Sequence, residues 1–218
     1  MPQPPATIWF YLAWVGCRAV FRAGLRWQVS GVENVPCSGP VLLMPNHVSY
    51  LDPPLVGAAV PRVTYYMAKV ELFQNLAGAW LLPRLNAFPV RRGYPDRPAL
   101  RRTLELLERG QAVIMFPEGT RSPDGSLQPA EPGAALIALK SRAPIVPVAI
   151  VGTEHIWPRW TKWPRLGRVR IRYGRPLTFP DYYDRRVNKN DLRRVGDLIM
   201  NRIAALLAEE RQQANTAA

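Results

Sequence analysis

The chain has 218 residues, of which 48% are hydrophobic, and its 29 Lys and Arg against 16 Asp and Glu give a net charge of +13. This length suits one domain with a sizeable core, and the charge indicates an anionic partner such as nucleic acid, acidic lipid or a phosphorylated substrate. Cys17 and Cys37 have no CxxC spacing, so the sequence offers no zinc site or disulfide framework, we expect no metal, and a reducing cytoplasm is the default.

Residues 8–17 are an apolar run, IWFYLAWVGC, which is followed by Arg18, Arg22 and Arg26 at a spacing of four. The run is shorter than the ~20 residues that span a bilayer, and no positive charge precedes it as in a signal peptide. We predict that residues 1–26 form a helix lying on an anionic membrane, with the three arginines on one face. The alternative is an ordinary amphipathic helix packed on the domain. The predicted membrane contacts here are Trp9, Phe10, Trp14, Arg18 and Arg22.

Residues 27–218 alternate predicted strands with predicted helices. The strands are predicted at 27–35, 40–44, 62–68, 86–91, 111–116, 145–151 and 168–173. The helices are predicted at 55–60, 71–82, 96–109, 131–142 and 190–208, before a polar, frayed tail. This alternation predicts an α/β domain whose mixed, largely parallel central sheet is flanked by helices.

Three of the predicted strands have informative side chains. Residues 40–44 are uninterrupted and apolar, which is typical of a central strand. Pro147 interrupts the strand at 145–151 and favours an edge position or a bulge. The strand at 168–173 alternates strictly between an apolar face and an arginine face.

The stretch NHVSYLD holds one of the two histidines, His47, with Asp52 five positions later. On one continuous helix this offset would separate the two side chains around the axis. Pro53 and Pro54 favour a helix that starts near them. We therefore predict a strand ending at Met44, a tight turn carrying His47, and a helix that starts after Asp52.

This turn would let Asp52 accept a hydrogen bond from one ring nitrogen of His47. That bond fixes the tautomer and leaves the other nitrogen free to take a proton, as a general base for a hydroxyl. The alternative is structural: Asp52 caps the following helix, and Ser49 caps a shorter turn in a Ser-x-x-Asp box.

Two further stretches lie at predicted strand ends, FPVRR at 88–92 and FPEGTRS at 116–122. Ligands of open α/β sheets bind at such ends, so the three stretches could converge at one edge of the sheet. Arginine is suited to bidentate contact with phosphate, and Gly119 lets the backbone approach closely. These residues indicate a phosphate site beside a histidine base.

With these motifs the chain resembles the glycerolipid acyltransferase family that includes the 1-acylglycerol-3-phosphate acyltransferases. The matching residues are His47 and Asp52 of a His-x4-Asp motif, Phe88 and Arg91 of a Phe-x-x-Arg motif, residues 116–122 of a Phe-Pro-Glu-Gly-Thr-Arg-Ser motif, and the proline-containing strand 145–150. The resemblance covers residues 27–174. Leu85 stands where the second motif usually has glycine, and Val90 where it often has an acidic residue.

The resemblance implies direct transfer of a fatty acyl group, without an acyl-enzyme, to the free hydroxyl of a lysophosphatidate, giving phosphatidic acid. Acyl-CoA or acyl-carrier protein would be the co-substrate, and no other cofactor is expected. His47, held by Asp52, would deprotonate the hydroxyl, and Arg91 and Arg121 would hold the acceptor phosphate.

The other residues of the motifs have alternative roles in the family pattern. Glu118 and Gly119 would shape the site, although a glutamate among arginines could instead orient them by ion pairing. Thr120 could donate to the phosphate or cap the loop. Arg92 could face the solvent or the phosphate.

The segment WPRWTKWPR at 157–165 interleaves tryptophans with cations. We predict a second membrane contact there through Trp157, Trp160 and Trp163, which would make the protein peripheral or monotopic on the cytoplasmic face. The alternative is a loop whose tryptophans cover the core. His155 is expected to be structural or exposed.

Several other functions compete with this prediction. The acceptor could be glycerol-3-phosphate or another lysophospholipid. A nucleic-acid-binding protein could use Arg168, Arg170 and Arg172 along a phosphate backbone, but it leaves the His47 and Glu118 motifs unexplained, as does a non-enzymatic membrane-surface protein. The chain has no Gly-x-Ser-x-Gly elbow and no P-loop, which argues against a serine hydrolase or a nucleotide site.

Overall fold

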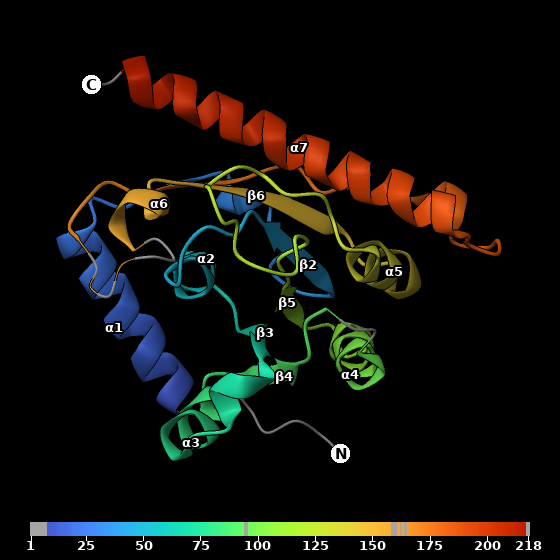
Figure 1. Ribbon diagram of the computed structural model, residues 1–218, viewed down its shortest axis with the longest axis horizontal. Coiled ribbons are helices and arrows are strands. Elements are labelled where there is room, and N and C mark those ends of the chain that lie inside the picture. Colours follow the sequence, from blue (N-terminus) through green and yellow to red (C-terminus); the bar gives the residue numbers. More distant parts are fainter. Residues whose placement is uncertain (1–7, 94–95, 158–160, 162, 164, 217–218) are drawn as a thin grey trace.

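A computed structural model describes residues 8–93, 96–157, 161, 163 and 165–216. Its strands form one sheet in the order β1-β7-β6-β2-β5-β3-β4, and helices cover both faces of this sheet (Figure 1). The strands are β1 (Gln28–Ser30), β2 (Val41–Pro45), β3 (Thr64–Lys69), β4 (Ala87–Val90), β5 (Ala112–Ile114), β6 (Ile145–Val151) and β7 (Arg170–Tyr173). The α-helices are α1 (Ile8–Gly24), α2 (Asp52–Ala59), α3 (Leu76–Arg84), α4 (Arg97–Glu108), α5 (Pro132–Ser141), α6 (Thr153–Ile156) and α7 (Lys189–Thr216), and the 3-10 helices are η1 (Val32–Asn34), η2 (Val70–Phe73) and η3 (Pro180–Tyr182).

The sheet is mixed and largely parallel, as predicted. Among the described strands only the β6–β7 pair is antiparallel. β2 lies in the middle of the order and all its residues are buried, which confirms the prediction of a central strand. Because β2, β3, β4, β5 and β6 run in one direction, the segments that follow them lie at the same edge of the sheet.

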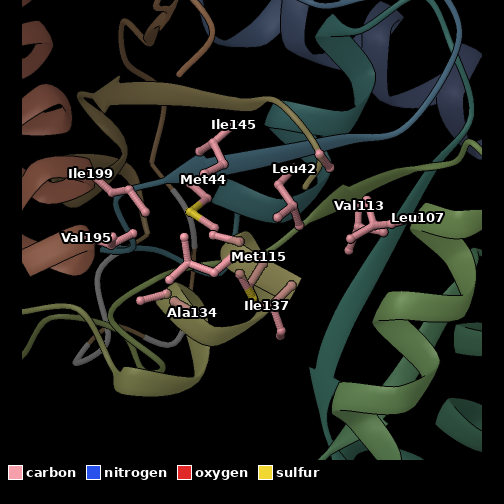
Figure 2. Packing of buried hydrophobic residues seen from close by; sticks show 14 of the residues in the cluster. Leu42, Met44, Leu107, Val113, Met115, Ala134, Ile137, Ile145, Val195 and Ile199 are labelled. Atoms are coloured by element: carbon pink, nitrogen blue, oxygen red, sulfur yellow. The ribbon is translucent and has the colours of Figure 1, made fainter. Parts of the chain in front are cut away.

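Two hydrophobic clusters pack on opposite faces of the sheet. Helices α4, α5 and α7 supply one cluster, in which Met44 of β2 lies near Val195 and Ile199 of α7 (Figure 2). Helices α1, α2 and α6 supply the other, which includes Phe21 and Leu55. Ile199 is fully buried, so Ile199→Ala would destabilise the fold by about 2–5 kcal/mol.

Pro147 lies in an inner strand, which corrects the prediction of an edge or a bulge. It pairs with Met44 on the β2 side of β6. On the other side, the ladder between β6 and β7 begins at Val148 and Tyr173, so Pro147 lies just beyond the end of β7. The missing N–H of Pro147 therefore leaves no ladder position unfilled, and its carbonyl oxygen still accepts from the Gly174 N–H at 2.8 Å.

Two predicted elements near the N-terminal half are shorter than expected. The strand predicted at 27–35 ends at Ser30, because Gly31 takes a φ of 71° and leads into η1. A Cβ at Gly31 would lie 2.1 Å from the carbonyl oxygen of Tyr173. The helix predicted at 71–82 is divided into η2 and α3, because the Asn75 side chain accepts from the Gly78 N–H and starts a new helix.

The last helix is longer than predicted and continues to Thr216. The polar residues beyond 208 are ordered by contacts with the sheet. Arg172 of β7 lies 3.3 Å from a carboxylate oxygen of Glu209 and 3.2 Å from one of Glu210. The predicted frayed tail is therefore part of α7.

The N-terminal helix α1 packs against α2. Trp14 donates its ring N–H to the Val60 carbonyl at 3.2 Å, and Arg18 donates to the Ala58 carbonyl at 2.7 Å. Phe10 is buried, which corrects its predicted place at a membrane. The three arginines do not share a face, because Arg18 turns inward and Arg26 lies beyond the helix end with a φ of 40°. Within the described part of the chain, no helix combines the length and the apolar character needed to cross a bilayer.

Candidate active site

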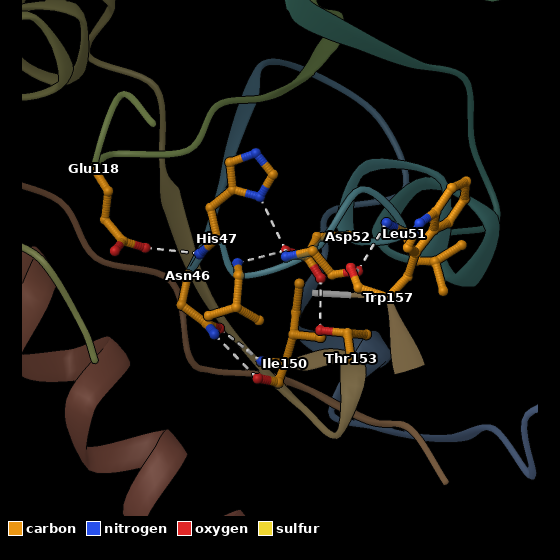
Figure 3. Close-up of polar contacts among 10 residues, drawn as sticks. Asn46, His47, Leu51, Asp52, Glu118, Ile150, Thr153 and Trp157 are labelled. Carbon is orange, nitrogen blue, oxygen red and sulfur yellow. Dashed lines mark hydrogen bonds and ion pairs between the residues drawn. The ribbon is translucent and has the colours of Figure 1, made fainter. Parts of the chain in front are cut away.

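The loop after β2 is fixed to β6 by Asn46. Its side-chain N–H donates to the Ile150 carbonyl at 3.0 Å, and its side-chain oxygen accepts from the Ile150 N–H at 2.8 Å (Figure 3). Asn46 is buried, so this pair of bonds sets where the chain leaves the sheet. The local sequence gives no signal for this role of Asn46, because its partner Ile150 lies 104 positions along the chain.

Asp52 organises the histidine turn. Its Oδ2 accepts from His47 Nδ1 at 2.9 Å and from the backbone N–H groups of Val48 and Ser49 at 2.7 Å each. Its Oδ1 accepts from the Thr153 hydroxyl at 2.7 Å. The predicted contact between His47 and Asp52 is confirmed, and the turn that the prolines favoured lies between them.

The alternative role predicted for Asp52 is also present in part. Asp52 does not cap the following helix, because α2 begins at Asp52 itself with Leu51 as its N-cap, but the bond from the Ser49 N–H to Asp52 is half of the predicted Ser-x-x-Asp box. The Ser49 hydroxyl donates to the Trp157 carbonyl at 2.7 Å and accepts from the Leu51 N–H at 3.2 Å. Asp52 thus both holds the turn and orients the imidazole.

The His47 side chain is almost enclosed, with 4% of the residue exposed, and its ring stacks on Phe116 at 3.9 Å between centroids. Burial lowers the pKa of His47; Asp52 opposes this effect, and the charges of Arg92 and Arg121 add to it. The imidazole is therefore neutral at physiological pH. With the proton assigned to Nδ1 by the bond to Asp52, Nε2 is the basic nitrogen, and no hydrogen bond to it is formed by the described residues.

Glu118 holds the backbone of His47. Its two carboxylate oxygens accept from the N–H groups of His47 at 2.7 Å and of Gln128 at 2.9 Å. The carbonyl of His47 accepts from the Ser122 N–H at 2.8 Å, so the FPEGTRS loop fixes both backbone polar groups of His47. Burial raises the pKa of Glu118 to about 7, against the effect of the two N–H donors. In the described residues Glu118 forms no ion pair with an arginine, contrary to the alternative predicted for it.

Gly119 is required by the turn in which it lies. Its φ is 69°, in the left-handed region, and a Cβ there would lie 2.8 Å from Cγ of Glu131. The space that Gly119 leaves open is therefore filled by the Glu131 side chain. Thr120, the next residue, is exposed on the same loop.

Arg121 and Arg92 form a pair of partly buried cations beside His47. The guanidinium carbon of Arg121 lies 3.5 Å from the centroid of the Tyr50 ring. Nη1 of Arg121 and Nε of Arg92 are buried, and neither has a hydrogen-bond partner among the described residues. Burial lowers the pKa of Arg92, and the charge of Arg121 lowers it further.

Buried guanidinium nitrogens without partners are costly, and an anion would satisfy both. The family pattern pairs Arg121 with Arg91, whose side chain is exposed and whose backbone N–H donates to Asp96. Arg92, left open by the sequence, is the arginine whose charge acts on His47 together with that of Arg121.

The tryptophan segment has mixed surroundings. Trp157 is half-buried against the core, as in the alternative predicted for it, and its ring lies 5.6 Å from that of Tyr50. Trp163 is 81% exposed, whereas Trp160 lies outside the described residues. His155 is exposed, as expected.

Comparison with known proteins places this site in a family context. A family model described as Acyltransferase matches residues 26–151. A Bacillus subtilis protein named 1-acyl-sn-glycerol-3-phosphate acyltransferase is 32% identical over 74% of this chain and 77% of its own length. A chloroplastic Brassica napus protein of the same activity name is 35% identical over 60% of this chain, but the match spans only 39% of that protein. The crystal structure of the 1-acyl-sn-glycerophosphate acyltransferase PlsC from Thermotoga maritima superposes with a TM-score of 0.70, at 27% identity, covering 90% of this chain and 79% of that chain.

Proposed function

This chain belongs to the acyltransferase family, and from that membership we propose that it transfers a fatty acyl group to the free hydroxyl of 1-acylglycerol-3-phosphate, giving phosphatidic acid. The names of its relatives from Bacillus subtilis and Brassica napus support this acceptor. The acyl donor is a thioester, either acyl-CoA or acyl-carrier protein. The observation that carries the proposal is His47 Nε2 beside two buried guanidinium nitrogens, all three without a hydrogen-bond partner in the part of the chain that the structure describes.

The first step is a proton transfer from the acceptor hydroxyl to Nε2 of His47. The hydroxyl oxygen forms a bond to the thioester carbonyl carbon, and a tetrahedral intermediate results. When the carbon–sulfur bond breaks, the thiol leaves with the proton that His47 took. Asp52 stabilises the imidazolium between these events, because its Oδ2 accepts from Nδ1 throughout.

The phosphate of the acceptor is held by Arg121 and Arg92. Its oxygens would accept from Nη1 of Arg121 and Nε of Arg92, to which no other described residue forms a hydrogen bond. Arg91, on the exposed side of the same segment, remains a predicted contributor. Two guanidinium groups beside a neutral base suit a substrate that is anionic at one end and uncharged at its hydroxyl.

An external hydroxyl is favoured over a protein nucleophile. Ser49, the serine nearest His47 in the chain, is fully buried and its hydroxyl donates to the Trp157 carbonyl. Its position is set by the fold and its proton is directed away from the imidazole. This arrangement supports direct transfer without an acyl-enzyme.

The competing nucleic-acid function has less support. The predicted arginine ladder is partly neutralised, because Arg172 pairs with Glu209 and Glu210 of α7. A groove that binds the phosphate backbone of a nucleic acid needs arginine side chains that are not paired with carboxylates. A non-enzymatic role gives no use to the buried His47–Asp52 pair.

Thiol release from a long-chain acyl-CoA by the purified protein tests the proposal. We expect release that requires lysophosphatidate and falls when lysophosphatidylcholine replaces it. Release in the absence of any acceptor would identify a thioesterase instead. Equal release with both acceptors would contradict the assignment of Arg92 and Arg121 to a terminal phosphate, because lysophosphatidylcholine carries its phosphate as a choline ester.

A further inference from the structure

Helix α4 has an arginine in the turn where its own dipole favours a carboxylate. Its first turn contains Arg97 and no Asp or Glu, and Arg101 follows one turn later. Carboxylates stabilise a helix near its N-terminus, whereas cations stabilise it near its C-terminus. The stability of the helix itself therefore does not explain these two arginines.

Arg97 and Arg101 also take no part in the hydrophobic core. The inner face of α4 buries Leu106 and Leu107 in the cluster that packs on the sheet face opposite α1. Arg97 and Arg101 are exposed, and their spacing of four makes them neighbours on the helix surface. Packing therefore does not explain them either.

No carboxylate of the described residues forms an ion pair with either arginine. The nearest carboxylate in the sequence is Asp96, the N-cap of α4. Its two oxygens accept from the backbone N–H groups of Arg91 at 2.7 Å and Ala99 at 3.0 Å. Asp96 thus holds the start of the helix, and the two guanidinium groups remain available to an anionic partner.

The N-terminal end of α4 lies beside the active site. Arg91, which Asp96 binds through its backbone, directly precedes Arg92 in the segment that leaves β4. The charge of Arg92 lowers the pKa of His47, so this segment is close to the base. Figure 1 shows α4 near β5 and away from α1. The exposed arginines of α4 are therefore next to the site but outside it.

We propose that Arg97 and Arg101 form the surface on which an acidic acyl-carrier protein docks when it delivers its thioester to the site. The inference rests on the proposed function, because it gives a place to one of the two donors named there. A carrier protein holds its thioester on a flexible arm, so its own surface contacts the enzyme beside the catalytic centre. Complementary charges at such a contact speed association and select the partner.

The nucleotide of acyl-CoA fits this surface less well. Small-molecule sites are concave and bury most of the ligand, whereas Arg97 and Arg101 lie on the convex outer face of a helix. Their Cβ atoms are about 5–6 Å apart, as for any helical pair at this spacing. Two exposed cations so arranged suit carboxylates on a second protein surface.

A lipid leaflet is also a poorer partner for α4. Helices that lie in a membrane interface carry large apolar side chains on the face that enters the acyl boundary. None of the large hydrophobic residues of α4 is exposed. Glu108, which is exposed in the last turn, would be repelled by an anionic leaflet.

The test compares palmitoyl-acyl-carrier protein with palmitoyl-CoA, two donors of the same acyl group, with lysophosphatidate as the acceptor. Arg97→Glu/Arg101→Glu reverses both charges of the surface, and phosphatidate is measured by mass spectrometry. We expect KM for the carrier protein to rise by at least about tenfold, because like charges would then face one another, and kcat to change little. KM for palmitoyl-CoA should stay near the wild-type value.

Arg193→Glu/Arg202→Glu is the matched control, because it makes the same change in net charge at exposed positions of α7. It should leave both KM values near those of the wild type. Salt should raise the KM of the wild type for the carrier protein but not that of Arg97→Glu/Arg101→Glu. Arg97→Glu alone places a carboxylate in the first turn of α4, so its Tm should equal or exceed that of the wild type.

Five results would overturn the inference: a wild type that uses palmitoyl-CoA but not the carrier protein, an unchanged KM for the carrier protein in Arg97→Glu/Arg101→Glu, an equal rise in KM for both donors, an equal rise in the control, or a lower Tm in Arg97→Glu. A variant that loses binding to phosphatidylglycerol vesicles would assign the arginines to lipid instead. Phosphatidate formation by the wild type alongside any of these results would refute the docking surface alone. Absence of phosphatidate with both donors would refute the proposed function, and the docking surface with it.

Discussion

Replacing Arg92 with glutamine tests the assignment of the anion site. The change removes a cation whose buried Nε has no partner in the described part of the chain and is proposed to bind a phosphate oxygen. A hydrogen bond to a charged group contributes about 1.5–3 kcal/mol, which corresponds to a factor of about 10–100 in affinity. We expect KM for lysophosphatidate to rise by that factor, with a smaller change in kcat.

The pH profile gives a second, independent readout of the same variant. The charge of Arg92 lowers the pKa of His47, so its removal raises that pKa. The base then becomes protonated at a higher pH, and the acid limb of kcat/KM moves upward in pH. Arg92→Lys keeps the charge, and it should restore the limb while leaving part of the loss in KM.

Arg91→Gln is the matched control, because Arg91 is the neighbouring residue and its side chain is exposed. The structure predicts a smaller rise in KM and no movement of the acid limb. If Arg91→Gln costs as much as Arg92→Gln, or if the limb does not move in Arg92→Gln, the site has been assigned to the wrong arginine.

Three further predictions concern the residues around the base. Thr153→Val deletes the hydroxyl that donates to Asp52; kcat should fall by about tenfold and recover in Thr153→Ser, and an unchanged kcat would deny Thr153 a positioning role. The pKa of Glu118 is raised from 4.5 to about 7 in the folded protein, so Glu118 stabilises the fold below pH 4.5 and this stabilisation is lost as pH rises through 7. The free energy of unfolding, measured with urea, should therefore fall less between pH 4.5 and about 8 in Glu118→Gln than in the wild type, and an equal fall in both proteins would contradict this. Tyr50→Leu removes the ring under Arg121 and should raise KM for the acceptor several-fold, whereas Tyr50→Phe keeps the ring and should leave KM unchanged. Similar KM values for the two variants would show that the ring contact does not position Arg121 for the acceptor.

The histidine turn could be predicted because its determinants are local. His47 and Asp52 lie five positions apart, and the two prolines that follow Asp52 restrict the backbone where the helix starts. The strand-end position of the motifs followed from apolar runs whose length and composition indicate buried parallel strands. The convergence of the three motifs at one edge of the sheet followed from the parallel direction of the strands that precede them.

The remaining parts of the site depend on contacts that the local sequence does not encode. Thr153 reaches Asp52 across 101 positions, and Asn46 reaches Ile150 across 104. Either side chain, read alone, is typical of a cap or a turn. Which of two adjacent arginines turns toward His47 depends on the irregular path after β4, so a motif spacing cannot decide it.

Pro147 shows the same limit for the fold. A proline normally excludes an inner strand because it withdraws one N–H from a ladder. Here β7 ends where that N–H would be needed, and the end of a neighbouring strand is a property of the whole sheet. Likewise, α7 continues past its predicted end because Arg172, on a different element, pairs with Glu209 and Glu210.

The most direct test of the central claim is the formation of phosphatidate by wild type and His47→Ala, measured by mass spectrometry after incubation with lysophosphatidate and a long-chain acyl-CoA. We predict that the wild type forms phosphatidate without any acylated protein, and that His47→Ala, folded as judged by its circular dichroism, forms none above background. Phosphatidate formation by His47→Ala at a rate near that of the wild type, or a stable acyl adduct on the protein, would contradict the mechanism.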